Sequence, residues 1–279
     1  MPRYKLIVAY DGTDFVGWQK QEPPDPDAPA PAPGEEPRRL YLRTVQHVLE
    51  QAVRKVVREP VVLVGASRTD SGVHANGQVA CFTSRPDPSK GVGWPIERGT
   101  EGLVKAINSK LPRDVFVYSC EVVDKKFDPI GRAVEKEYCY SIVTGQVRPL
   151  WDRRYVFHTW YELDAAKMQQ AADLMVGEHD FVCFSQASHG RKTTVRTIYK
   201  CEIETPQPGK FVVRISGNGF LYNMVRIIGG TLVEVGRGKI EPEMVREMIA
   251  SGDRKLAGVT LPPMGLRLEW VRYEEGNRE

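Results

Sequence analysis

The sequence has 279 residues, of which 41% are hydrophobic and 27% are charged, as in soluble globular proteins. This length suffices for one large domain or two of ordinary size. No apolar stretch approaches the length of a membrane span, and a strand pattern that begins at Tyr4 leaves no room for a signal or transit peptide. The five cysteines form no C-x-x-C pair, which predicts reduced thiols in a cytoplasmic protein and argues against structural zinc.

The formal net charge is only +3, but the acidic residues are unevenly distributed. Residues 22–36 contain five acids and no Lys or Arg, so the rest of the chain carries 39 basic and 31 acidic side chains, a net charge of +8. This excess is compatible with contacts to RNA phosphates and also with an ordinary basic enzyme. The same segment, extended to residue 37, holds seven prolines and shows no periodicity. We expect it to be an extended, mobile insertion without regular structure.

The first half of the chain alternates strand and helix patterns. Apolar residues at helical spacing predict a helix over Thr44–Arg58, with Thr44 as its N-cap. A second helix is predicted over Glu101–Asn108, after a loop that begins near Ser89. The predicted strands of this half are Tyr4–Val8, Val61–Val64, Val79–Phe82 and Val115–Val122.

The second half repeats this pattern. Asp164 is expected to cap a helix that ends before Gly177, and a second helix after Gly219 is predicted to contain both Tyr222 and Arg226. The predicted strands are Tyr138–Val143, Phe211–Ile215 and Leu268–Tyr273. Two comparable halves of this kind, residues 1–128 and 129–279, predict an α+β architecture in which helices back a largely antiparallel sheet.

One short segment carries most of the chemistry that the sequence offers. After the apolar residues Val61–Val64, the chain enters a tight turn between Gly65 and Gly72 that contains Arg68 and Asp70. In an extended loop, residues two apart share a face, so the arginine is expected to keep the carboxylate ionised. A charged carboxylate held at a strand end suits nucleophilic attack. The residues alone also allow a simple turn with an ion pair.

The motif around Asp70 and several others resemble the tRNA pseudouridine synthase A (TruA-type) family, in the same order along nearly the whole chain. The similar segments are Tyr10–Gln19, Thr44–Gln46, Arg68–Val79, Glu178–Phe181, Arg196–Ile198, Phe220–Arg226 and Pro262–Leu266. The resemblance implies the pseudouridine synthase fold, in which the sheets of two related halves join around a basic RNA-binding cleft. It also implies an isomerase that breaks the N-glycosidic bond of uridine, rotates the uracil and rejoins it through C5. This reaction has no redox step, so no cofactor and no metal are expected.

The resemblance also assigns roles to individual residues. Asp70 is implied to be the nucleophile, and attack at uracil C6 or at ribose C1′ both remain open. Tyr138 matches the family's tyrosine that packs against the target base, although Tyr140 lies on the same strand face and the residues alone cannot choose between them. Arg226 is implied to keep the catalytic carboxylate ionised and aimed, and Arg68 to help displace the base and hold phosphate.

Other motif residues are given structural roles. His74 is interpreted as shaping the motif, because the family assigns it no clear proton-transfer task. Asp11 and Trp18 are interpreted as structural or tRNA-contacting residues.

The resulting hypothesis is a cytoplasmic tRNA pseudouridine synthase that modifies positions 38, 39 and 40 of the anticodon stem-loop. The resemblance implies a homodimer with tRNA as its partner and no membrane association. Three alternatives stay open: a family member with another RNA target, a catalytically silent RNA-binding protein, and a carboxylate glycosidase. The last would need a second carboxylate about 5–10 Å from Asp70, and no motif supplies one.

Overall fold

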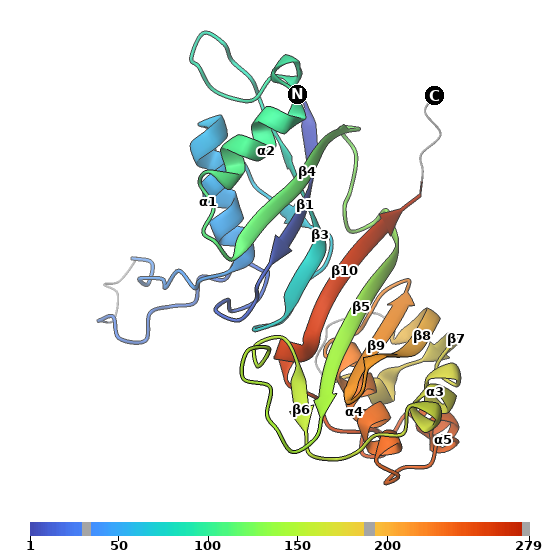
Figure 1. The fold of residues 1–279 in the computed structure, drawn as a ribbon. Helices are drawn as coiled ribbons and strands as arrows, with labels where there is room; N and C mark the ends of the chain where they lie inside the picture. Colours follow the sequence, from blue (N-terminus) through green and yellow to red (C-terminus); the bar gives the residue numbers. More distant parts are fainter. Residues whose placement is uncertain (30–34, 187–192, 275–279) are drawn as a thin grey trace. The chain divides into compact units, whose positions relative to one another are not determined.

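The computed structural model describes residues 1–29, 35–186 and 193–274 (Figure 1). Its described residues divide into two compact units. The first unit contains Met1–Gly72 and Val79–Pro129, and the second contains Val73–Gln78 together with the chain from Ile130 onward. The mixed α+β class that the sequence predicts is confirmed in both units.

The first unit is a small sheet backed by two helices. Strand β1 lies between β4, to which it is antiparallel, and β3, and β2 pairs with β3. Helices α1 and α2 pack against each other, and α2 also packs on β4 (Figure 1). The elements are β1 (Arg3–Tyr10), α1 (Val45–Val57), β2 (Val64–Gly65), β3 (His74–Thr83), the 3-10 turn Ile96–Arg98, α2 (Thr100–Asn108) and β4 (Val115–Val123).

The second unit is a larger sheet in the strand order β10-β5-β9-β8-β7, in which all neighbours are antiparallel. Strand β6 pairs in parallel with β5, and the first residues of β3 pair in parallel with β10. The elements are β5 (Ala133–Thr144), β6 (Phe157–Thr159), α3 (Ala165–Asp173), β7 (Gly177–Asp180), β8 (Val195–Gln207), β9 (Lys210–Gly217), α4 (Met224–Gly236), α5 (Met244–Ser251) and β10 (Leu266–Tyr273), with 3-10 turns at Val182–Phe184 and Pro263–Gly265.

Helix α4 is the central helix of the second unit. All of its residues are buried except Arg226 and Glu234. A helix that is apolar on nearly every side is stable only when other elements surround it. Arg226 is therefore one of two charged side chains on a helix whose other residues are buried.

Helix starts that the sequence predicts from capping residues are confirmed. The Thr44 hydroxyl accepts a hydrogen bond from the His47 N–H at 3.4 Å. The Asp164 carboxylate accepts hydrogen bonds from the N–H groups of Ala166 and Lys167 at 2.9 and 3.1 Å. These bonds satisfy N–H groups that have no partner within the helix, which explains why the caps predict the ends well.

The buried strand predicted over Val61–Val64 is wrong. Strand β2 contains only Val64 and Gly65, and the side chain of Val62 is 65% exposed. Side chains of α1 take the place of a strand partner. The backbone N–H of Leu63 donates to the Glu50 carboxylate at 3.1 Å, and its carbonyl accepts from the Gln46 amide at 2.8 Å. These bonds satisfy the backbone of this segment without a sheet.

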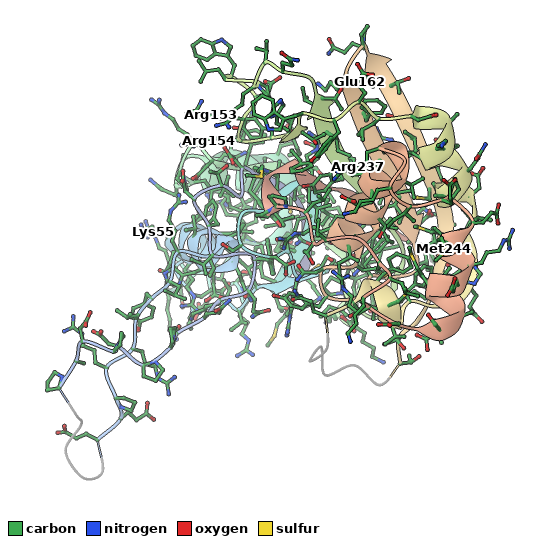
Figure 2. All side chains as sticks on the ribbon, turned by 90° about the horizontal axis from the view of Figure 1, so that it is seen from below. Lys55, Arg153, Arg154, Glu162, Arg237 and Met244 are labelled. Carbon is green, nitrogen blue, oxygen red and sulfur yellow. The ribbon has the colours of Figure 1, made fainter. Side chains whose placement is uncertain are left out.

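The proline-rich insertion is more ordered at its base than the sequence predicts. Its two ends form an antiparallel bridge between Pro24 and Arg39. The Asp25 N–H donates to the Arg38 carbonyl at 2.7 Å, and the described part of the insertion projects from the first unit (Figures 1 and 2). Residues 30–34 lie outside the described residues.

Candidate active site

Asp70 lies in the loop between β2 and β3, and we refer to residues 66–73 as the Asp70 loop. Thr69 is buried beside it, and its hydroxyl shares a 2.7 Å hydrogen bond with the phenol of Tyr10 at the end of β1. The Thr69 carbonyl accepts from the Trp18 N–H at 3.0 Å. Both partners come from the opening motif of the sequence, so this motif fixes the backbone next to Asp70.

Gly17 lets the opening motif approach the Asp70 loop closely. Its φ is +97°, and a Cβ at this position would lie only 2.7 Å from the Thr69 carbonyl oxygen. Gly65, at the start of the loop, is just as constrained because a Cβ there would overlap the indole of the buried Trp18. Larger residues at either position would force the two segments apart.

The far end of the Asp70 loop is held in the same way. The Gly72 N–H and the Ser71 hydroxyl both donate to the Phe15 carbonyl at 3.2 Å. The opening motif is in turn joined to α1, because the Val45 and Gln46 N–H groups donate to the carbonyls of residues 17 and 18. Three motifs that are distant in sequence thus form one hydrogen-bonded structure around Asp70.

Asp70 is half-buried and Arg68 is exposed, with the buried Thr69 between them. This alternation agrees with side chains that share a face. The expected pairing of Arg68 with Asp70 stays a prediction. At an exposed position such a pair contributes little and immobilises a long side chain.

Tyr138 and Tyr140 lie on β5 in the second unit, and their surroundings differ. Tyr140 is fully buried, its hydroxyl donates to the Pro262 carbonyl at 2.6 Å, and burial raises its pKa. A Cβ at Gly265 would lie 2.7 Å from its ring, so Tyr140 is part of the core. Tyr138 is 6% exposed and meets the ring of Phe220 edge-on at a centroid distance of 5.3 Å.

A polar cluster lies where β5, β10 and the start of β3 meet. The Glu269 carboxylate accepts hydrogen bonds from the Cys139 thiol at 2.6 Å, from Arg267 at 2.7 Å and from the Asn76 amide at 3.3 Å. Burial alone would raise the pKa of Glu269, but these hydrogen bonds and the Arg267 charge lower it. Burial also raises the pKa of the Cys139 thiol to about 12, so this thiol is a donor and not a nucleophile.

Arg226 is held on the first turn of α4 by two hydrogen bonds. Its Nε donates to the Leu261 carbonyl at 2.6 Å, and its Nη1 donates to the Asn223 side-chain oxygen at 2.7 Å. Two donors fixed on different partners set the plane of the guanidinium.

The prediction that α4 contains Tyr222 is wrong. The helix begins at Met224, after Asn223, which adopts a left-handed conformation with φ of +59°. Tyr222 is exposed and lies before the helix, so it does not lie one helical turn from Arg226.

His74 opens β3 and is buried in the second unit. Its Nε2 is hydrogen-bonded to the Arg154 carbonyl at 3.0 Å, and its ring lies 5.2 Å from that of Tyr155. The expectation of a structural role is therefore supported, but what His74 holds in place is the loop that follows β5.

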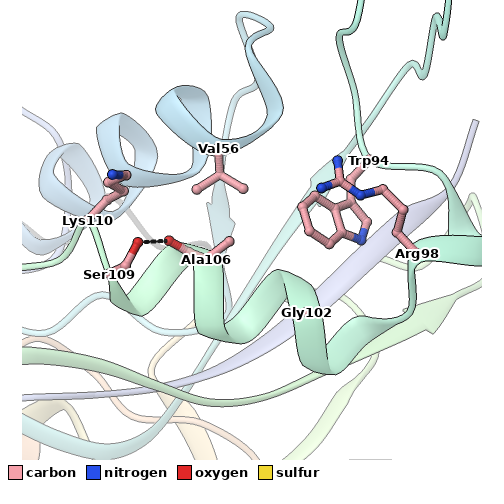
Figure 3. A pocket seen from close by; sticks show the side chains of 7 residues that line it. All are labelled: Val56, Trp94, Arg98, Gly102, Ala106, Ser109 and Lys110. Carbon is pink, nitrogen blue, oxygen red and sulfur yellow. Dashed lines mark hydrogen bonds between the residues drawn. The ribbon is translucent and has the colours of Figure 1, made fainter.

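A separate pocket of about 470 Å³ lies between α1 and α2 in the first unit (Figure 3). In this pocket the Arg98 guanidinium stacks on Trp94, with its Cζ atom 3.9 Å from the centroid of the Trp94 ring. The other lining residues are Val56, Gly102, Ala106, Ser109 and Lys110. None of the residues to which the sequence assigns chemistry lines this pocket.

Nowhere in the described ranges do three or more His, Cys, Asp or Glu side chains gather closely enough to hold a metal ion. Every helix of the described structure is too short or too polar to cross a membrane.

Comparison with known proteins connects these observations. A family model described as tRNA pseudouridine synthase matches residues 171–274. The chain is 40% identical over 274 residues to tRNA pseudouridine synthase A 2 of Clostridium perfringens, covering 98% of this chain and 100% of that one. It is also 40% identical to tRNA pseudouridine synthase A of Thermosipho africanus, with the same two shares covered.

A third relative, tRNA pseudouridine synthase A of Bacillus pumilus, is 40% identical over 98% of this chain and 99% of its own length. A crystal structure of a Cbf5–Nop10–Gar1 complex is similar at 12% identity, over 95% of this chain and 57% of that chain, and its TM-score of 0.34 is too low to bear on the fold. The near-complete matches define a pseudouridine synthase, which is an isomerase. The chain belongs to the tRNA pseudouridine synthase A family.

Proposed function

We propose that this enzyme isomerises uridine to pseudouridine at positions 38, 39 and 40 of the tRNA anticodon stem-loop, with Asp70 as the nucleophile. The observation that best supports this role is the construction of the Asp70 loop. Tyr10, Gly17 and Trp18 fix the backbone on one side of the carboxylate, and the Phe15 carbonyl fixes it on the other. A nucleophile needs such a support, because small displacements of a reacting group lower the rate steeply.

The reaction also needs a surface that holds the uracil after it leaves the sugar. We propose Tyr138 for this task. Its neighbour Tyr140 is used by the core, and the edge-on contact with Phe220 fixes the orientation of the Tyr138 ring. Stacking of a base on an aromatic ring contributes about 1–3 kcal/mol, which offsets part of the cost of extruding a nucleotide.

The two arginines have different proposed roles. Arg226, whose guanidinium plane is fixed by Leu261 and Asn223, keeps the Asp70 carboxylate ionised and aimed. Arg68 is exposed, which suits a side chain that contacts the phosphates of the substrate. Residues 1–128 would thus supply the nucleophile and residues 129–279 the base-stacking tyrosine. The active form would be a cytoplasmic homodimer with tRNA bound across both subunits.

The decisive experiment is tritium release from tRNA labelled at uridine C5, because the new carbon–carbon bond must expel that hydrogen. We expect release by the wild type, none by Asp70→Asn, and unchanged release by Asp87→Asn. Asp87 is a matched control because it lies in an exposed turn of the same unit. The Asp70→Asn variant should still bind tRNA. Equal release by Asp70→Asn and the wild type would remove Asp70 from the mechanism.

A second experiment tests the target positions. Pseudouridine is mapped in total RNA from a strain that lacks the gene, and we expect its loss at positions 38, 39 and 40 of tRNA. Loss at another tRNA position, or in another RNA, would assign a different target within the same family. Tight tRNA binding without any tritium release would favour the silent RNA-binding protein.

A further inference from the structure

A loop that follows β5 is unusually exposed, and we refer to residues 145–156 as the Trp151 loop. It is closed at its base, because the Gly145 N–H donates to the Thr159 carbonyl at 3.1 Å and His158 Nε2 is hydrogen-bonded to the Gly145 carbonyl at 2.7 Å. Strand β6, which ends the loop, then pairs with the end of β5. A loop whose ends are tied in this way presents its tip to solvent on a fixed base.

The tip of the Trp151 loop combines apolar and cationic side chains. Trp151 is 87% exposed, Val147 84% and Leu150 62%. Exposed tryptophans are uncommon, and several apolar side chains exposed together mark an interaction site. The loop also contains three arginines and only one acid, Asp152, so it carries a net charge of +2.

Internal hydrogen bonds stabilise this loop. The Arg153 Nη1 donates to the Leu150 carbonyl at 2.7 Å, and the Tyr155 N–H donates to the Asp152 carbonyl at 2.8 Å. His74 anchors the last part of the loop, because it contacts the Arg154 carbonyl and the Tyr155 ring. His74 lies four residues after Asp70 in the same motif, so one motif carries both the proposed nucleophile and the anchor of the Trp151 loop.

We propose that the Trp151 loop is a further tRNA-binding site, in which an unpaired base stacks on Trp151 while Arg148 and Arg153 contact the adjacent phosphates. This inference rests on the proposed function, because it takes tRNA as the substrate. Both arginines are exposed (Arg153 is labelled in Figure 2). Aromatic side chains interleaved with arginines are the surface that single-stranded nucleic acid requires.

Charge favours RNA over a second copy of the chain at this site. A two-fold interface centred on this loop would bring the same patch of each subunit against itself, so the net +2 of one loop would face the +2 of the other. A polyanion gains from the same charge. The exposed indole suits both RNA and a second copy of the chain. The positive charge of the arginines therefore favours RNA.

The test measures the Kd of tRNA by filter binding and the kcat and KM of tritium release for Trp151→Ala. We expect Kd and KM to rise roughly 5- to 150-fold, the range of one lost base stack, with kcat at saturating tRNA unchanged. Trp151→Tyr should restore most of the affinity, because it keeps an aromatic face. Tyr199→Ala, an exposed aromatic on β8 of the same unit, is the matched control and should bind as the wild type does.

The arginines are tested by the salt dependence of binding. Arg148→Ala combined with Arg153→Ala should lower the slope of log Kd against log salt by about 1.4–1.8, the value for two phosphate contacts. Arg246→Ala, an exposed arginine on α5, should leave the slope unchanged. An unchanged Kd for Trp151→Ala, or an unchanged slope for the double variant, would overturn the proposal.

Two further outcomes separate this proposal from its alternatives. If Trp151→Ala converts a dimer to a monomer in sedimentation equilibrium, the loop is an interface between copies and the RNA proposal is overturned. If the wild type binds tRNA but releases no tritium, the proposed function fails, and the Kd comparison still decides whether the Trp151 loop binds RNA.

Discussion

Replacement of Gly17 by alanine should displace the Asp70 loop, and the size of the displacement can be worked out from the structure. An ordinary side chain at φ of +97° is strained by about 1–3 kcal/mol. The new Cβ would lie 2.7 Å from the Thr69 carbonyl oxygen, whereas real contacts of this kind stay above 3.0 Å and become ordinary at 3.4 Å. Because the opposing atom is backbone, the segments must separate by between 0.3 and 0.7 Å.

The displacement acts next to the proposed nucleophile, since the same Cβ would lie 3.2 Å from the backbone carbon of Asp70. Misplacement of a reacting group by about 1 Å can cost roughly 100-fold in rate. For a shift below 1 Å we expect kcat of tritium release to fall about 10- to 100-fold. The KM for tRNA should change little, because Gly17 has no side chain to contact RNA and acts on the position of the proposed nucleophile.

Gly91→Ala is the matched control for this experiment. Gly91 also has a positive φ, +62°, but a Cβ there would meet nothing within 4 Å. The control therefore carries backbone strain without a clash, and its kcat should equal that of the wild type while its Tm falls by a few degrees. If Gly17→Ala retained the wild-type kcat at a temperature where it is folded, the Asp70 loop would not depend on the opening motif.

Three other predictions follow from buried contacts. Tyr10→Phe and Thr69→Val should each destabilise the protein by about 1–3 kcal/mol, because each change removes one partner of a buried hydrogen bond. The double variant should lose less than the sum of the two. Urea unfolding measures this coupling, and strictly additive losses would show that the two hydroxyls do not interact. Glu269→Gln should flatten the acid limb of the stability curve. Because the pKa of Glu269 is lowered in the folded state, its carboxylate stabilises the fold at pH values above its ordinary pKa of 4.5. This stability is lost as the pH falls through the folded pKa. An equal loss of stability in the wild type and in Glu269→Gln between neutral pH and about pH 3.5 would contradict this reasoning. Finally, the Cys139 thiol, with its pKa raised to about 12, should react with a disulfide reagent at mildly alkaline pH only after unfolding, and rapid native labelling of this thiol would show that its environment is open.

The sequence predicts those helix starts that depend on a single capping side chain. Thr44 and Asp164 each satisfy backbone N–H groups of the helix that follows, so the residue type fixes the boundary. Residues 61–64 could not be predicted in this way. Their backbone is satisfied by Gln46 and Glu50, two polar side chains of a helix that comes earlier in the chain. A short apolar run reads as a strand unless that distant partner is known.

The same limit applies to the candidate site. The spacing of Tyr138 and Tyr140 places both on one strand, and only their packing shows that Tyr140 belongs to the core. Helix α4 begins at Met224, after Tyr222, because Asn223 adopts a left-handed conformation. Helix propensities along the sequence do not predict this conformation. The resemblance to a family selects Tyr138 and Arg226, and their roles remain proposals.

In the motif around Asp70, the reactivity of a side chain does not predict its role. His74 has the side chain best suited to proton transfer, yet it is buried and bonded to the carbonyl of Arg154, so the structure uses it as an anchor. Thr69, which has no obvious chemistry, is the residue that ties the loop to Tyr10. A motif can therefore be constrained at positions other than that of its proposed nucleophile. Thr69 and Ser71 hold the opening motif against the Asp70 loop, whereas His74 holds a different segment, the loop that follows β5.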